Sequence, residues 1–157
     1  MGSLDIEVGM KYLLSEFSEK TRIIDCDVDP FTPKCWGISE HRHGGKLIFN
    51  PVHTTLYLVE GQGRNNIAGR DMRKLLRKKP VLNANVLDYL IKKENWHLIP
   101  EEWKEGYIFF WGTVYHDRGV KLYVRYLCWV GKGWDQGFDS VSERFDRNRP
   151  AALLVAS

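Results

Sequence analysis

Three apolar and aromatic stretches in the second half of the chain constrain the fold most. They cover residues 107–115, 121–130 and 134–141, and the short segments Asp117-Arg118-Gly119 and Gly131-Lys132-Gly133 separate them. Alternation with a period of two is typical of strands, and Gly-containing segments of this length are typical of hairpin turns. The pattern therefore predicts an antiparallel meander of three strands.

Alternation along the middle stretch places two sets of side chains on opposite faces of the predicted sheet. One face carries Leu122, Val124, Tyr126 and Cys128, and the other carries Lys121, Tyr123, Arg125, Leu127 and Trp129. Both faces are rich in apolar or aromatic carbon, so we expect another element to cover the second face.

Aromatic side chains that stay exposed on this sheet would form a binding surface. Rings of this kind stack on a small molecule or on a protein partner, and they would equally suit a homodimer interface. The candidate ligand-binding residues are Trp111, Tyr123, Trp129 and Trp134. The leading hypothesis is a non-enzymatic binding or interaction module, because no acid, base or nucleophile set is arranged with any specificity.

The first part of the chain carries the helical signals. Apolar spacing predicts a helix that follows Ser3 and a short helix over about 70–78, which Pro80 terminates. Asn83 is a suitable N-cap for the clearest helix, with the apolar stripe Val86, Leu87, Leu90 and Ile91. Short extended segments are expected at 23–24, 47–49 and 54–59, and the tail 151–155 is expected to pack against the sheet.

These signals together predict one α+β domain over residues 1–157, with short helices packed on an antiparallel sheet. Residues 1–105 form its mostly helical and loop half, and residues 106–157 form the aromatic β-meander half. A chain of 157 residues, 43% of them hydrophobic and 27% charged, has a globular composition. A chain of that length buries roughly two-thirds of its unfolded surface in one core.

The cysteines and the first residues predict the compartment. Cys26, Cys35 and Cys128 cannot all pair, which favours a reducing environment. Residues 1–10 lack a basic segment followed by an apolar one, and no run approaches the roughly 18 apolar residues of a membrane span. We therefore expect a soluble cytoplasmic protein that does not insert into a membrane.

A cluster of cations near residue 75 is the strongest functional signal. It consists of Arg64, Arg70, Arg73, Lys74, Arg77, Lys78 and Lys79, opposed locally by Asp71 alone, in a chain whose net charge is +3. On a helix, Arg70, Arg73, Lys74 and Arg77 project from one side. The alternative hypothesis is therefore a nucleic-acid-binding protein that holds phosphates on this side while nearby aromatic rings stack on bases. A merely solvated helix face is the other interpretation.

Two thiols and two imidazoles in one loop-rich segment are candidate zinc ligands. They are Cys26, Cys35, His41 and His43. Structural zinc sites usually place two to four residues between cysteines, and here eight intervene, so buried or solvent-facing side chains without a metal are the alternative. Cys26 with His41 would also supply a thiol nucleophile and a base, but the acidic neighbours Asp25 and Asp27 oppose ionisation of the thiol.

Several segments carry a resemblance to a known family. They are Ile24-Asp25-Cys26-Asp27 with Pro30-Phe31, Trp36 and His43-Gly44-Gly45, then Pro-Val-Leu-Asn-Ala-Asn-Val-Leu-Asp-Tyr-Leu at 80–90, Leu-Ile-Pro-Glu-Glu-Trp-Lys at 98–104 and Phe-Phe-Trp-Gly-Thr at 109–113. In these segments the chain resembles a family of small uncharacterised proteins from uncultivated bacterial lineages. The resemblance implies a self-contained domain and transfers no activity, cofactor or site residue. Cys35 and His43 depart from the family pattern, which argues against a metal site that uses them.

Overall fold

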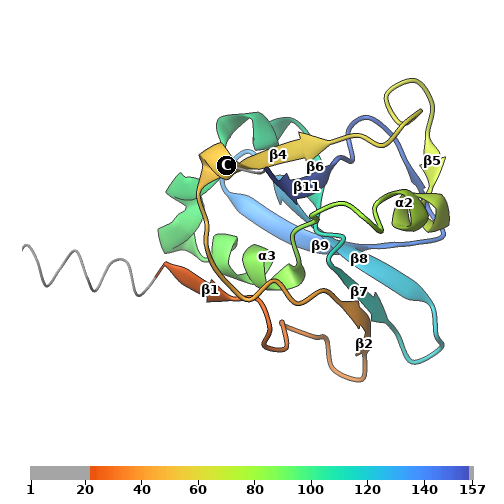
Figure 1. Cartoon of the computed structure of the whole chain (residues 1–157), viewed down its shortest axis with the longest axis horizontal. Helices are drawn as coiled ribbons and strands as arrows, with labels where there is room; N and C mark the ends of the chain where they lie inside the picture. The colour runs from red at the N-terminus through yellow and green to blue at the C-terminus, as the bar shows by residue number, and fades with distance from the viewer. Residues whose placement is uncertain (1–21, 156–157) are drawn as a thin grey trace, which may run out of the picture.

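The computed structural model describes residues 22–155, and it contains short helices on both faces of a curled sheet (Figure 1). The helix predicted after Ser3 lies outside these residues. The strands are β1 (Ile23–Asp25), β2 (Gly37–His41), β3 (Lys46–Ile48), β4 (Thr54–Tyr57), β5 (Ile67–Ala68), β6 (Tyr107–Phe109), β7 (Thr113–His116), β8 (Leu122–Trp129), β9 (Trp134–Ser140), β10 (Arg144–Phe145) and β11 (Ala151–Leu154). The helices are α2 (Gly69–Leu75) and α3 (Ala84–Leu90), with the 3-10 helices η1 (Pro51–His53), η2 (Lys93–Leu98) and η3 (Glu101–Glu105).

The predicted meander is present and forms the centre of the main sheet. β8 pairs antiparallel with β9 along one edge, and with β6 and β7 in succession along the other. β2 continues the sheet beyond β7, while β11 and then β4 continue it beyond β6. The α+β class is confirmed. The sheet is mixed because β11 runs parallel to β6.

The first strand of the meander is broken in two, which the period-two pattern did not predict. From Phe109 to Tyr115 the chain advances six residues, while the paired part of β8 advances three, from Tyr126 to Tyr123. The excess is taken up around Gly112, whose N–H donates to Leu82 O at 3.0 Å and whose carbonyl accepts from Arg42 N at 2.8 Å. The sheet therefore divides here, into a β7–β2 branch and a β6–β11 branch.

Each face of the sheet has its own apolar core. α3, η2 and η3 pack over one face, around Leu127, Ile108 and Phe110. Phe109, Trp111 and Val124 point to the other face, where they pack with side chains of α2 and β10. Successive side chains of β6 and β8 thus point alternately into the two cores. The face that carries Arg125 and Leu127 was expected to be covered, and α3 covers it.

Polar contacts join α3 to the rest of the fold. Asn83 caps the helix, since its Oδ1 accepts from Asn85 N at 3.1 Å, while its Nδ2 donates to the carbonyls of Cys26 and Arg42. Asp88 accepts from the Nη1 of Arg125 at 2.7 Å, and Arg125 is only 2% exposed. A buried guanidinium with its partner in place ties β8 to the helix that covers it.

Two local expectations change, and a third is confirmed. The predicted buried side of the 70–78 helix included Leu75, but the helix ends at Leu75 and that side chain is 48% exposed, whereas Met72 and Leu76 are buried. The extended segments predicted at residues 47–49 and 54–59 are present as β3 and β4, and the Pro-containing 3-10 helix η1 lies between them. The tail does not merely pack against the sheet, because β11 lies within it, between β4 and β6.

None of the helices between residues 22 and 155 has the length and apolar character needed to span a membrane.

Candidate functional site

The cations predicted on one side of the 70–78 helix line a hollow beside the sheet. This hollow has a volume of about 360 Å³, and Arg70, Arg73 and Lys74 of α2, with Arg77 just after the helix, form one wall of it. Glu40, in β2, and Arg42, directly after that strand, also line it, together with Leu122 and Val141. The sequence thus predicted one wall of a site whose second wall comes from a different part of the chain.

A close approach of backbones places α2 in this position. The helix begins at Gly69, where a Cβ atom would lie 2.1 Å from the carbonyl oxygen of Val141. Only glycine fits at that separation, so the first turn of α2 sits directly against the chain that follows β9. Arg70, the next residue, consequently lies beside Val141 and Leu122.

A second hollow of about 550 Å³ continues the first and shares Arg70, Leu122 and Val141 with it. It adds two cations, Lys121 and Arg144, and the hydroxyl-bearing residues Ser140 and Ser142. We call the two hollows together the basic trough. Its seven cations are Arg42, Arg70, Arg73, Lys74, Arg77, Lys121 and Arg144, and Glu40 is the one carboxylate in its lining.

Ion pairing already occupies that carboxylate. Arg73 donates to Glu40 Oε2 from Nη2 at 2.9 Å, and Arg42 Nε lies 3.4 Å from Oε1. Partial burial would raise the pKa of Glu40, but the hydrogen bonds and charges of Arg73 and Arg42 outweigh it and hold that pKa below its ordinary value. Among residues 22–155, no carboxylate pairs with the other five trough cations, so the trough has an excess of positive charge.

The predicted aromatic surface is largely buried. Trp111 is 2% exposed and Trp134 is 7% exposed, so neither offers a ring to a partner. This corrects the expectation for both residues, because α2 with β10 and α3 with η3 close over the two faces of the sheet. Trp129 and Tyr123 are partly exposed, and each already contacts another ring, that of Trp134 or of Trp36.

The four candidate zinc ligands do not converge. Cys35 is exposed and its Sγ accepts from Arg118 Nη2 at 2.7 Å, whereas Cys26 is buried. His41 uses one ring nitrogen on Thr113 Oγ1 at 2.8 Å and the other on the Cys26 carbonyl at 3.0 Å. Within the described part of the chain no three His, Cys, Asp or Glu side chains are grouped as metal ligands would be. The predicted zinc site is therefore not assembled by this fold.

Cys26 is also unsuited to nucleophilic chemistry with His41. Burial, followed by the nearby charges of Asp27 and Asp25, raises the pKa of the Cys26 thiol to about 11. The thiolate is the reactive form, and at neutral pH it is essentially absent at this position. His41 contacts the carbonyl oxygen of Cys26 by its Nε2, where it takes a structural role.

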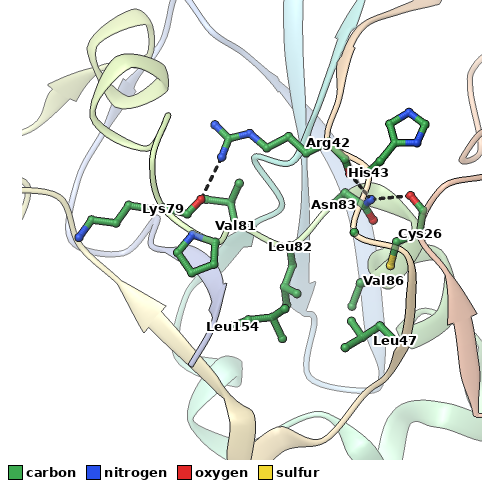
Figure 2. Close-up of a pocket in the computed structure, with 12 residues that line it drawn as sticks. Cys26, Arg42, His43, Leu47, Lys79, Val81, Leu82, Asn83, Val86 and Leu154 are labelled. Atoms are coloured by element: carbon green, nitrogen blue, oxygen red, sulfur yellow. Dashed lines mark hydrogen bonds between the residues drawn. The ribbon is translucent and has the colours of Figure 1, made fainter. Parts of the chain in front are cut away.

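A separate pocket lies between the segment after β2 and the segment that leads into α3 (Figure 2). Its volume is about 240 Å³, and Cys26, Leu82 and Leu154 are among the residues that line it. Arg42 lines both this pocket and the trough. Nothing in the sequence pattern indicated the pocket, because its walls come from four separate segments.

No protein-family model, curated protein sequence or solved structure matches the chain. The functional assignment therefore depends on the geometry of the trough and the pocket.

Proposed function

We propose that this protein binds nucleic acid through the sugar-phosphate backbone, which lies in the basic trough. The observation that supports the proposal is the convergence of seven cations on two hollows that share three lining residues. The cations come from the segment after β2, from α2 and the residues that follow it, from the residue directly before β8 and from β10, and the one carboxylate in the lining is itself paired. An elongated array of positive charge matches a polymer that carries a phosphate at every nucleotide, because each contact releases condensed counterions.

The lining favours backbone contacts over base contacts. Neither hollow has an aromatic residue in its lining, so the base stacking expected from the sequence has no ring to use there. Arg and Lys side chains and the hydroxyls of Ser140 and Ser142 instead suit phosphate oxygens. Phosphate contacts position a protein without reading sequence, so we expect affinities that vary little between sequences.

The aromatic-surface hypothesis has less support. Of its four candidate residues, Trp111 and Trp134 are buried, and Trp129 is flanked by the Trp134 ring and by the Lys104 ammonium, 4.3 Å from its centroid. Tyr123 is partly exposed, but its ring already packs on the Trp36 ring at 4.5 Å, and Trp36 also contacts Phe138. The four candidate residues therefore do not form one shared stacking surface.

Fluorescence anisotropy of labelled single- and double-stranded oligonucleotides tests the proposal. For four to seven phosphate contacts, raising salt from about 50 to 200 mM should weaken binding by roughly a hundredfold to several thousandfold. Changing the oligonucleotide sequence should alter affinity far less than changing salt. Absence of binding at about 50 mM salt would contradict the proposal and identify α2 as a solvated helix.

A charge-reversed pair of variants locates the interface. Arg70→Glu with Arg77→Glu removes two exposed trough cations that form no ion pair within residues 22–155, so the fold should persist. We expect binding at least tenfold weaker and a log-log salt slope smaller by about 2. The matched control is Lys92→Glu with Lys93→Glu, which makes the same change in net charge on exposed residues. These residues follow α3, and α3 covers the opposite face of the sheet. Equal losses in both variants would show that net charge, and not the trough, governs binding.

A further inference from the structure

The pocket in Figure 2 has an apolar floor large enough for an organic ligand. The floor consists of Leu47, Val81, Leu82, Val86 and Leu154. Its volume of about 240 Å³ exceeds the roughly 150 Å³ of an apolar cavity that accommodates benzene. The space therefore fits one ring or a short hydrocarbon chain.

The polar groups in the pocket wall are already engaged. Asn83 accepts from Asn85 N through Oδ1 and donates through Nδ2 to the carbonyls of Cys26 and Arg42, at 3.0 and 2.9 Å. The Cys26 thiol is 3% exposed and stays protonated at neutral pH. Because the floor has no free charged group and its amide is satisfied, the buried part of a ligand must be apolar.

The mouth of the pocket has the opposite character. Arg42, His43 and Lys79 are part of the lining, which includes no Asp or Glu, and His43 Nδ1 lies 3.5 Å from Asp27 Oδ1 just outside it. Arg42 and Arg73 both pair with Glu40, so this one carboxylate neutralises only one of the two guanidinium charges. The Lys79 side chain extends away from the other lining residues in Figure 2, its ammonium lies 5.0 Å from the centroid of the Tyr57 ring, and among residues 22–155 no carboxylate pairs with it. The exposed end of a ligand is thus favoured if it is anionic.

The two walls are held together without a ligand. Arg42 donates from Nη1 to Lys79 O at 2.9 Å, across the mouth of the pocket, as Figure 2 shows. The same two segments are also joined by the hydrogen bond from Asn83 Nδ2 to Arg42 O, at 2.9 Å. A pocket whose walls are fixed in advance avoids the cost of ordering them on binding.

We propose that this pocket binds a small organic acid with a hydrocarbon body of about six to eight carbons, its carboxylate at the Arg42 and Lys79 mouth. Burial of the hydrocarbon on the apolar floor supplies affinity, and the cations select the charge of the head group. The inference is independent of nucleic-acid binding, since it depends on a different cavity and a different ligand chemistry.

Methyl NMR with three matched probes tests this inference. Octanoate should shift the methyl resonances of Leu82, Val86 and Leu154 in a saturable manner. Octylammonium, with the same chain and the opposite charge, should bind at least tenfold more weakly, and acetate, which lacks the chain, should leave these methyls unchanged up to about 10 mM. Equal binding of octylammonium, or shifts confined to other residues, would overturn the proposal.

Two variants separate the floor from the mouth. Leu154→Trp fills the pocket from a partly exposed position and should abolish octanoate binding in a protein whose remaining NMR spectrum shows that it is folded. Lys79→Glu places an anion at the mouth and should weaken octanoate by roughly tenfold. Lys78→Glu is the control, because this exposed neighbour makes the same charge change and does not line the pocket. Equal weakening by Lys78→Glu, or full binding by Leu154→Trp, would refute the assignment.

Discussion

Cys26 shows how a single side chain acquires properties from its surroundings. It is 3% exposed and lines the pocket, with Asp25 and Asp27 on either side in sequence. Burial and then these carboxylates disfavour the thiolate, and the pKa of Cys26 is raised from 9.0 to about 11. The thiol therefore acts as a small apolar group at neutral pH, and it is neither a nucleophile nor a metal ligand there.

The same pKa predicts an alkaline loss of stability. Between pH 9 and about 11 the unfolded chain releases the Cys26 proton while the folded chain retains it. The free energy of unfolding therefore falls as pH rises through that window, by at most about 3 kcal/mol. Burial also raises the pKa of Tyr115, which acts in the same direction.

Urea unfolding at pH 8, 9 and 10 of the unmodified protein and of Cys26→Ala isolates the cysteine, because the tyrosines are common to both. We expect the variant to lose stability less steeply with pH. Parallel curves would show that Cys26 ionises alike in the folded and unfolded chains.

At the scale of elements, the break between β6 and β7 positions both candidate sites. Gly112 lies in that break and bonds to Leu82 on one side and to Arg42 on the other. From there the two segments diverge, one towards α3 and one towards β3, and the pocket occupies the opening between them. Arg42 is thereby held where it lines both pocket and trough.

Gly112→Ala should disturb this junction. A Cβ at residue 112 would lie 2.7 Å from Asn83 Cβ and 2.8 Å from Asn83 Cα, so the helix cap or the sheet must move. We expect a loss of about 2–3 kcal/mol in the free energy of unfolding, measured by urea denaturation. Gly119→Ala is the control, since its Cβ would meet nothing closer than 3.6 Å, and it should change stability by less than about 0.5 kcal/mol. Similar losses for both variants would argue that the close approach is relaxed in solution.

At the scale of the whole molecule, the two halves expected from the sequence share one sheet. β4 comes from the first half and β6 from the second, and β11, the last strand of the chain, lies between them. Ala151 and Ala152 are fully buried in this strand. The sheet can therefore form completely only when β4, β6 and β11, which are far apart in sequence, come together. Folding thus depends strongly on contacts between distant segments.

Placing a carboxylate in β11 tests this dependence. Ala152→Asp buries an unpaired charge in the core and should cost more than about 4 kcal/mol, enough to abolish the folded NMR spectrum. Val155→Asp makes a comparable change one residue after the strand, at a side chain that is 43% exposed, and should leave the fold intact. A folded Ala152→Asp protein would contradict the central position of β11.

Local signals were sufficient for the features that depend on neighbouring residues. Alternation and glycine turns predicted the β8–β9 hairpin, because both are set by backbone conformation within a few residues. Asn83 predicted the start of α3 for the same reason, since its side chain caps an amide two residues away. The cations of α2 were likewise recognisable as one side of a helix.

Tertiary structure alone decided which of these features face a partner. Trp111 and Trp134 are indistinguishable from exposed aromatic residues until α2 and α3 are placed over the sheet. Arg42, Lys121 and Arg144 join the α2 cations only through long-range packing, so no spacing in the sequence could connect them. The amino-acid sequence by itself determined the β8–β9 hairpin, the start of α3 and the positive charge around α2, because each depends on neighbouring residues. The close approach of distant backbones, at Gly69 and Gly112, determined where that charge and the apolar pocket meet.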